Sequence, residues 1–459
     1  MSGLLIKQRM GARRAREGFW LDDEPGRLDH ASLALRERNR ASRRYIRTHG
    51  WKGFNMALTY TLIGTPFSAA TIKARLLLRW ANAPMMEKAA TVAVVQSYIK
   101  PRLKTIATPL IVSSDQASFT DTRAFIDALG RDHAVHALRP KTPAQGFAND
   151  LLEAWADSDF SRQAEYVYWV CERDQAKARL AEFLEREAPR EQAERRAHLV
   201  SVQVGKRFAD DGFDKHSSDA VKAELAANLE RLDKALGESA YLFGDRPATS
   251  EFALAGALHI LASTSIGADM LSAYPRLAAW RMRLTAVDGL AQGEHRRVSS
   301  CPSAFMQLMR HAAKEFVPRA LGCASAVADW AEANPGIRAL PDQIRLGGGR
   351  QRPSRRKSQS RPAWRTREAY WLSRLGERAR PRHGVENAEL YRFLKMVGLS
   401  PLREFVPPRE LIFQNHRLEL TLRDVHAEPD HGSLLNVESA LMKARQSSAD
   451  IAELTAIHV

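Results

Sequence analysis

The sequence predicts a small mixed α/β domain followed by an all-helical domain, with basic segments on both flanks. Three observations predict this fold class. Short β-like and helical runs alternate before residue 138, the periodic stretches after residue 149 are helical, and Lys and Arg concentrate near the two ends. A chain of 459 residues is too long for one ordinary core. We therefore expect a basic N-terminal extension at 1–54, a sheet domain at 55–138, a helical domain at 145–340, a disordered basic linker at 341–384 and a C-terminal extension of unpredicted fold at 385–459.

The first predicted strand leads directly into a helix. Leu58 to Ile63 alternates like a strand, and Gly64-Thr-Pro66 interrupts it. Ser68 then opens a run with apolar residues at helical spacing, Ile72 and Leu76. This stretch predicts a strand, a tight turn and a helix with a hydroxyl at its start.

Three further strands are expected before the next helix. We predict them at Thr91 to Tyr98, at Leu110 to Val112 after Thr108-Pro109, and at Ser118 to Thr120. A helix should follow from Asp121. The resulting order, β-α-β-β-β-α, predicts a small mixed sheet with helices packed on it.

The helical part shows a clear apolar stripe and then an abrupt change. The stripe is formed by residues spaced four, four, three and four apart: Val221, Leu225, Leu229, Leu232 and Leu236. Near Leu340 the periodicity ends, and residues 345–382 hold 13 Lys/Arg against 2 Asp/Glu. Such a segment should not offset the entropy of ordering its backbone, so we expect it to be disordered. A shortened chain of residues 55–340 should then fold alone.

Composition is that of a soluble globular protein, with 44% hydrophobic and 27% charged residues. The net charge of +16 comes mainly from the two flanks, so a folded core that binds nucleic acid is disfavoured. The basic tails could still bind polyanions weakly and without sequence preference. The chain has three cysteines, and their spacing is not that of a zinc site, so we expect neither a disulfide framework nor a bound metal. So few cysteines are typical of a protein in a reducing compartment, and we expect the cytoplasm. Because no stretch of 18 apolar residues is free of charge, we expect no membrane span.

Short motifs in a fixed order resemble those of the glutathione S-transferase superfamily, as a divergent, bacterial-type member. In the N-terminal part these are Gly64-Thr-Pro-Phe-Ser68, Thr108-Pro109 and Asp121-Thr122. In the helical part they are Tyr241-Leu-Phe-Gly244-Asp245-Arg-Pro247 and Tyr274-Pro-Arg-Leu-Ala-Ala-Trp280. The resemblance covers roughly residues 57–335 and implies a thioredoxin-like domain followed by a helical domain.

The resemblance implies a role for each motif in binding glutathione as co-substrate. Ser68, at a helix N-terminus, would stabilise the glutathione thiolate, and a cis Thr108-Pro109 bond would turn the Thr108 backbone toward the cysteinyl part. Asp121 would meet the γ-glutamyl ammonium and Thr122 its carboxylate. The alternative uses are structural: Ser68 and Asp121 as plain helix caps, and Pro109 as an ordinary trans proline at a strand entry.

Other residues keep two interpretations or none. Lys100, Arg102 and Lys104 could hold the glycyl carboxylate, or could simply be solvated. The aromatic set Tyr166, Tyr168 and Trp169 could line an apolar pocket for the second substrate, or belong to the core.

One departure from the family pattern concerns a helix cap. Ala248 stands where the family commonly has a Thr cap and Glu251 where it has Asp, so a hydroxyl cap is lost unless Thr249 or Ser250 replaces it.

Ser rather than Cys at position 68 decides which chemistry we expect. A serine cannot form mixed disulfides, which favours conjugation of glutathione to an apolar electrophile, or peroxide reduction, over thiol transfer. We expect a glutathione transferase that forms a homodimer. Two alternatives stay open: a non-catalytic transferase-like module for binding or assembly, and a non-specific polyanion binder acting through the basic tails.

Overall fold

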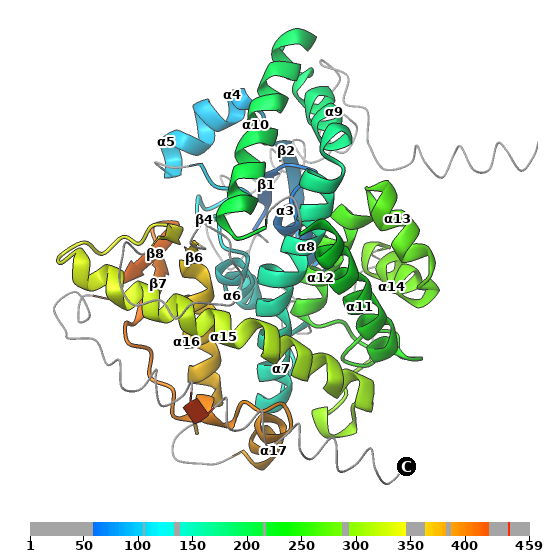
Figure 1. Ribbon diagram of the computed structural model, residues 1–459, viewed down its shortest axis with the longest axis vertical. Helices are drawn as coiled ribbons and strands as arrows, with labels where there is room; N and C mark the ends of the chain where they lie inside the picture. Colours follow the sequence, from blue (N-terminus) through cyan, green and yellow to red (C-terminus); the bar gives the residue numbers. More distant parts are fainter. Residues whose placement is uncertain are drawn as a thin grey trace, which may run out of the picture. The chain divides into compact units, whose positions relative to one another are not determined.

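The chain divides into two compact units, Met1–Met56 and Ala57–Val459, and the structure described belongs to the second. It is a computed structural model (Figure 1). It describes residues 58–103, 106–132, 138–213, 217–286, 293–345, 363–381, 387–421 and 439–440.

A four-stranded mixed sheet opens the described chain. It contains β1 (Tyr60–Gly64), β2 (Met85–Ala89), β3 (Leu110–Ser113) and β4 (Ser118–Phe119), in the order β2-β1-β3-β4. Strand β1 runs parallel to β2 and antiparallel to β3, and β4 runs antiparallel to β3. The predicted mixed sheet is therefore confirmed, and this is the thioredoxin-like part of the fold.

Helices cover both faces of the sheet because β1 and β3 alternate their side chains. On one face, Leu62 and Ile111 belong to a large core with α3 (Ala69–Trp80) and α6 (Thr122–Asp132). On the other face, Ile63 and Leu110 pack with residues of α5 (Lys100–Leu103) and the turn before it, while α4 (Val92–Val94) begins that helical stretch.

The strand predicted at Thr91 to Tyr98 is wrong. Those residues form α4 and the π-helical turn Val95–Ile99, and the second strand lies earlier, at Met85–Ala89. The β-branched run favoured a strand, but the Thr91 hydroxyl accepts a hydrogen bond from the Val94 amide (3.4 Å) and caps a helix. Tertiary packing of the buried Ile99 then outweighs local β propensity.

The helical domain that follows confirms the second half of the predicted fold class. Its helices are α7 (Pro143–Trp155), α8 (Ser161–Tyr166), α9 (Arg173–Leu184), α10 (Arg190–Asp210), α11 (Ser218–Leu236), α12 (Thr249–Ala262), α13 (Ser265–Ser272), α14 (Pro275–Thr285) and α15 (Ser303–Ala333). Helix α12 crosses α3 closely at Gly256, where a Cβ would lie 2.4 Å from the Ala69 carbonyl oxygen. Only glycine fits this crossing, which joins the sheet and the helical domain.

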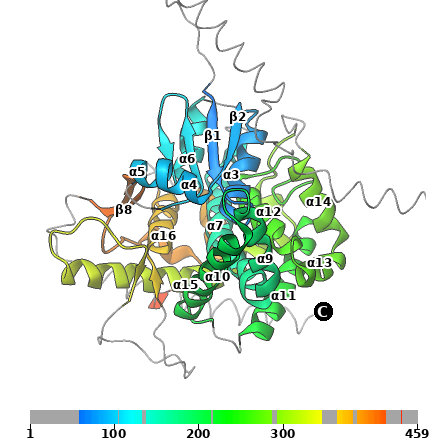
Figure 2. The ribbon, with the colours of Figure 1, turned by 90° about the horizontal axis from the view of Figure 1, so that it is seen from above.

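The C-terminal region is folded where the structure describes it, which corrects the predicted disorder of 341–384 for residues 341–345 and 363–381. This region contains β5 (Gln343–Ile344), β6 (Trp364–Arg365), α16 (Thr366–Ala379), α17 (Ala388–Met396), β7 (Leu411–Gln414) and β8 (Arg417–Leu420). Helix α16 runs beside α7 and α15 in Figures 1 and 2. We call residues 363–421, in their described parts, the C-terminal segment.

Paired charges and an apolar helix face explain why this basic segment folds. Trp371, Leu372 and Leu375 lie at helical spacing on α16, are at most 3% exposed, and join the same large core as the sheet. Four arginines of β6 and α16 pair with carboxylates of the preceding domains: Arg365 with Asp211, Arg367 with Asp121, Arg374 with Asp127 and Arg378 with Asp150. The charge that predicted disorder is thus neutralised within the fold. The basic run at 350–357 lies outside the described residues.

Within the described residues, no single helix is both long and apolar enough to cross a membrane. Helices α12 and α13 satisfy that criterion only as a pair, and they are bent by 116° where they meet.

Candidate functional site

The three N-terminal motifs meet at one end of the sheet. The pairing of Ile63 with Leu110 brings the turn after β1 beside Thr108-Pro109, which precedes β3. The pairing of Ile111 with Phe119 brings the end of β4, and so Asp121, to the same edge. The N-termini of α3 and α6 therefore lie at the edge where β3 begins. We refer to this edge as the motif edge.

Ser68 is the N-cap of α3. Its backbone is extended, and its hydroxyl oxygen accepts a hydrogen bond from the Thr71 amide (3.2 Å). The side chain is partly buried, at the entrance to a helix whose first turn carries no acidic residue. The capping role is thus present, and it leaves the hydroxyl proton available as a donor.

Thr108 and Pro109 are joined by a cis peptide bond, the isomer that the resemblance implies. Thr108 is exposed, whereas Pro109 is buried against the start of β3. The motif edge therefore presents the Thr108 backbone near the turn that carries Ser68.

Asp121 and Thr122 are placed differently, since both are buried at 5% and 7% exposure. One carboxylate oxygen of Asp121 accepts from the Ala124 amide (2.8 Å) and caps α6. The other lies 2.8 Å from the guanidinium of Arg367, on α16. The C-terminal segment therefore reaches the motif edge, which sequence reasoning did not anticipate.

The aromatic set next to the Ser68 turn belongs to the core. Tyr166, Tyr168 and Trp169 are at most 8% exposed. The ring of Phe67 stacks on Tyr168 (centroids 6.0 Å apart) and meets Trp169 edge-on (6.4 Å). Burial raises the pKa of Tyr168 to about 12, so its hydroxyl stays protonated. These rings support the turn that carries Ser68.

The basic residues considered for the glycyl carboxylate do not gather at the motif edge. Arg102 donates to the hydroxyl of Ser118, the first residue of β4 (2.9 Å), and to the side chain of Gln116 in the turn between β3 and β4 (2.8 Å). Both lie at the end of β3 that is opposite the motif edge. Lys100 is exposed, and Lys104 lies outside the described residues.

A buried ion cluster lies beneath the motif edge, between α3 and α7. The ammonium of Lys73, 1% exposed, lies 2.7 Å from Glu153 and 2.8 Å from Asp157. Burial opposes the charge of Lys73, yet the two carboxylates raise the pKa of Lys73 above its usual value. Burial also disfavours ionised Glu153, but Lys73 and Arg123 lower the pKa of Glu153 to about 2.

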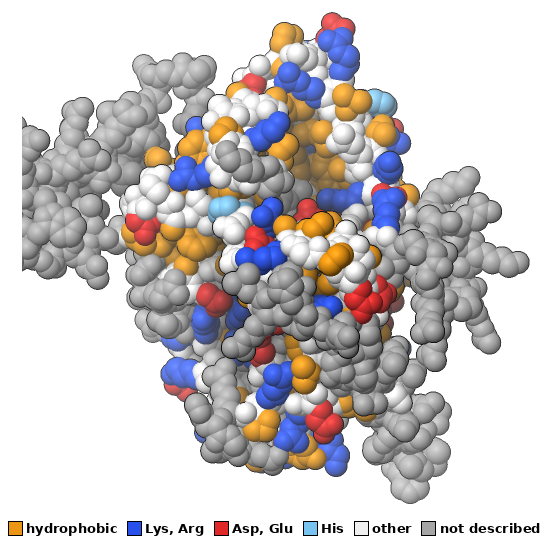
Figure 3. All heavy atoms as spheres, turned by 90° about the vertical axis from the view of Figure 1, so that its left-hand side faces the viewer, with side chains coloured by type: hydrophobic (Ala, Val, Ile, Leu, Met, Phe, Trp, Pro, Cys, Tyr) orange, Lys and Arg blue, Asp and Glu red, His pale blue; other side chains and the backbone are white. Residues whose placement is uncertain are grey.

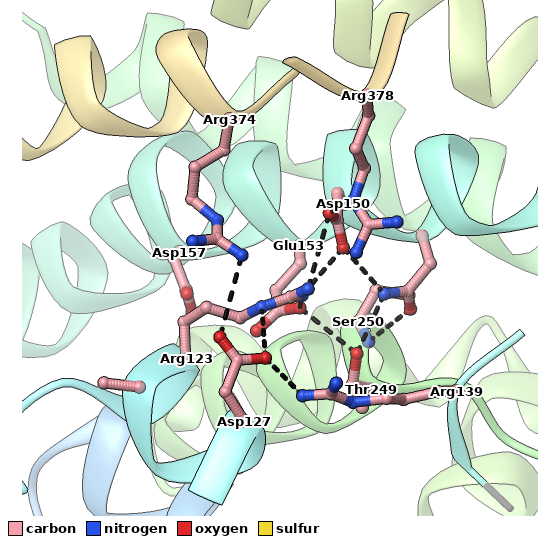
Figure 4. Close-up of polar contacts among 12 residues, drawn as sticks. Arg123, Asp127, Arg139, Asp150, Glu153, Asp157, Thr249, Ser250, Arg374 and Arg378 are labelled. Atoms are coloured by element: carbon pink, nitrogen blue, oxygen red, sulfur yellow. Dashed lines mark hydrogen bonds and ion pairs between the residues drawn. The ribbon is translucent and has the colours of Figure 1, made fainter. Parts of the chain in front are cut away.

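Arg123 extends this cluster from α6 to α7. Its guanidinium lies 2.7 Å from Asp150 and 3.3 Å from Glu153. Figure 4 draws these contacts as dashed lines. Asp150 also pairs with Arg378 of α16. The cluster thus links the sheet domain, the helical domain and the C-terminal segment through fully paired charges, which holds the first turn of α6 in place.

The cap of α12 comes from a distant residue. Glu251 accepts from the Ala248 amide (3.1 Å), which keeps one half of a capping box. The lost hydroxyl is replaced by Asn149 of α7, whose side-chain oxygen accepts from the Ser250 amide (2.9 Å). The expectation that Thr249 or Ser250 would replace it is therefore wrong.

Sequence reasoning missed Lys73, Glu153, Asp157 and Arg367. The available signal was a charged residue on an apolar helix face: Lys73 stands among buried apolar residues of α3, and Glu153 among those of α7. Within the described ranges, no group of three or more His, Cys, Asp or Glu side chains is arranged to hold a metal ion.

Part of the helical domain matches a known sequence family. Residues 203–283 match the sequence family described as "Glutathione S-transferase, C-terminal domain". No curated protein matches the chain.

Three solved structures that resemble this chain superpose on it with TM-scores below 0.5. A glutathione S-transferase from Rhodospirillum rubrum F11 is 14% identical and covers 54% of this chain and 99% of its own, with a TM-score of 0.37. A GST-like protein from Pseudomonas syringae is 21% identical and covers 52% and 69%, with a TM-score of 0.34. FzlA from C. crescentus is 16% identical and covers 55% and 91%, with a TM-score of 0.37. Residues 203–283 thus match the C-terminal domain of glutathione S-transferases, and the sheet that precedes them in the chain is thioredoxin-like.

Proposed function

We propose that this protein binds glutathione at the motif edge and activates its sulfur, either for conjugation to an apolar electrophile or for peroxide reduction. The observation that carries the proposal is the convergence of Ser68, Thr108 and Asp121, from three separate parts of the sequence, on one end of the sheet. A capping role alone would not require these three residues to share an edge.

The chemistry follows from the start of α3. A thiol is mostly protonated at pH 7, and a helix N-terminus and a hydroxyl donor both favour the thiolate. Because the Ser68 oxygen already accepts from Thr71, its proton can point to a sulfur placed above the turn. The thiol proton passes to water, and the sulfur lone pair forms a bond to the electrophilic carbon while the leaving group departs with its electron pair.

Peroxide reduction uses the same thiolate. The sulfur attacks one peroxide oxygen, the O–O bond breaks, and an alcohol or water leaves. A second glutathione then converts the resulting sulfenic acid to glutathione disulfide and water. The upper part of the face that carries α4 and α5 is hollowed and exposes hydrophobic side chains within the hollow (Figure 3), which supports an apolar second substrate.

A specific observation favours a second candidate function, a non-catalytic module for binding or assembly. Asp121 and Thr122 are covered, and Asp121 is already paired with Arg367. We further propose that the protein forms a homodimer, which light scattering tests, and that it is cytoplasmic, which cell fractionation tests. We also propose weak polyanion binding through the basic tails, which retention on heparin tests.

Replacement of Ser68 tests the catalytic proposal. Ser68→Ala should reduce conjugation by about 10- to 1,000-fold, the range for loss of one donor at a developing anion, while calorimetry shows a nearly unchanged affinity for glutathione. Thr264→Ala is a matched control, because Thr264 caps α13 through the Gly267 amide (2.9 Å) away from the motif edge. Full activity of Ser68→Ala would show that Ser68 only caps α3 and takes no part in catalysis. Binding without any turnover by the unaltered protein would favour the non-catalytic module.

A further inference from the structure

The two halves of the motif edge differ in how far they are open to solvent. Thr108 is exposed and Ser68 is partly buried, so the half that would receive a thiol and its cysteinyl backbone is accessible. Asp121 and Thr122 are at most 7% exposed, so the half that would receive an amino acid end is closed. The difference coincides with the place where the C-terminal segment reaches the edge.

The group that meets Asp121 there is a cation. The guanidinium of Arg367 lies 2.8 Å from Oδ2 of Asp121, which we call the outer oxygen. The other oxygen, Oδ1, accepts a hydrogen bond from the Ala124 amide and caps α6. An ammonium brought by a ligand would seek the same outer oxygen, because that oxygen is not committed to the helix backbone. Arg367 therefore stands where such an ammonium would have to stand.

The Arg367 side chain is placed so that it could leave this position without unfolding α16. It is 49% exposed, and its guanidinium lies over the ring of Phe413 (5.9 Å). The rest of α16 is held by the buried side chains of Trp371 and Leu372. Rotation of this one long side chain would free the Asp121 oxygen that it contacts.

We propose that Arg367 is a specificity-determining residue that competes, from within the chain, with the amino group of the ligand for Asp121. The inference rests on the proposed function, since it concerns the same site. It implies that the unaltered protein distinguishes poorly between thiol peptides with and without a free α-amino group, because the oxygen that would recognise this group is already paired.

The test compares two ligands and four proteins by calorimetric titration. The ligands are glutathione and its deaminated analogue, which lacks the α-ammonium. The proteins are the unaltered chain, Arg367→Ala, Arg367→Lys and the matched control Arg374→Ala, two turns further along the same helix. Thermal unfolding of each protein establishes that it is folded.

We expect Arg367→Ala to bind glutathione about 3- to 30-fold more tightly than the unaltered protein and to bind the deaminated analogue with unchanged affinity. The range lies between the contribution of an exposed ion pair and that of a charge-assisted hydrogen bond. Arg367→Lys, which keeps a cation, and Arg374→Ala should stay close to the unaltered protein. Equal glutathione affinity in Arg367→Ala and the unaltered protein would overturn the inference alone. Weaker binding by Arg367→Ala would also overturn it, since Arg367 would then hold the ligand. Absence of glutathione binding in all four proteins would overturn the proposed function, and this inference with it.

Discussion

Loss of the buried ammonium at position 73 should destabilise the fold far more than loss of an exposed cation. Lys73→Met keeps the length and packing of the side chain but removes its charge. The two carboxylates beside it, at 2.7 Å on Glu153 and 2.8 Å on Asp157, then lose their shared counterion. Glu153 keeps Arg123 at 3.3 Å, so its loss is partial.

Two lines of reasoning give the magnitude. Removal of one member of a buried ion pair costs about 3–5 kcal/mol, because the remaining charge is buried without compensation. A pKa of about 2 for Glu153, against a usual 4.5, corresponds to about 3 kcal/mol of stability at neutral pH for Lys73, Arg123 and Thr249 together, so it sets an upper limit on the share of Lys73 at Glu153. We therefore expect Lys73→Met to lower the free energy of unfolding by about 3 kcal/mol at pH 7.

The pH dependence has a definite sign. Because Lys73 and Arg123 lower the pKa of Glu153, its contribution is fully present above about pH 4.5 and disappears as pH falls toward 2. The difference between Lys73→Met and the unaltered protein should accordingly narrow by about 1 kcal/mol between pH 7 and pH 4. Protonation of Glu153 and Asp157 removes buried negative charge that lacks a counterion in the variant, so it restores more stability to the variant than to the unaltered protein.

Urea denaturation at pH 7 and pH 4, followed by tryptophan fluorescence, measures both effects, since Trp80 and Trp155 are buried on α3 and α7, the helices that carry Lys73 and Glu153. Arg195→Met is the matched control, because Arg195 pairs with Glu191 on the exposed surface of α10 and should cost below about 1 kcal/mol. A loss for Lys73→Met no larger than that for Arg195→Met, or a difference that widens at pH 4, would refute the reasoning.

Two further predictions concern the helical domain and its boundary. Asn149→Ala removes the acceptor for the Ser250 amide and a donor to Thr249, which should cost about 2 kcal/mol in thermal or urea unfolding; an unchanged stability would show that another group caps α12. In contrast to the expectation from the sequence that residues 55–340 fold alone, a shortened chain of residues 55–345 should aggregate or unfold, because it lacks α16 and so exposes apolar surface of α7 and α15. A soluble, cooperatively folded product in size-exclusion chromatography and denaturation would contradict this prediction.

The sequence alone predicts those parts of the fold that depend on local patterns. The apolar stripe predicts α11, and the turn-and-cap pattern at Ser68 and at Asp121 predicts the starts of α3 and α6. Such features are encoded within a few residues, because a cap is a contact between a side chain and an amide two or three positions later. The same local signals, in their order, carried the resemblance to the glutathione S-transferase superfamily.

Local signals misled where a distant partner decides the outcome. The β-branched run from Thr91 became helical because its buried face meets the sheet, while the less β-prone Met85–Ala89 pairs with β1 as a strand. The basic C-terminal segment became ordered because carboxylates far away in the sequence neutralise its arginines. Composition within a window gives no information on partners outside it.

The sequence by itself thus determined the mixed sheet, the helical domain that follows it and the residues at the motif edge. Only the tertiary structure decided that Asp121 meets Arg367, that Asn149 caps α12 and that Lys73 is fully buried between two carboxylates. The physical reason is the same in each case. A buried polar group must find a partner wherever the chain can supply one, and the partners here stand 80 or more residues away, where no sequence periodicity connects them.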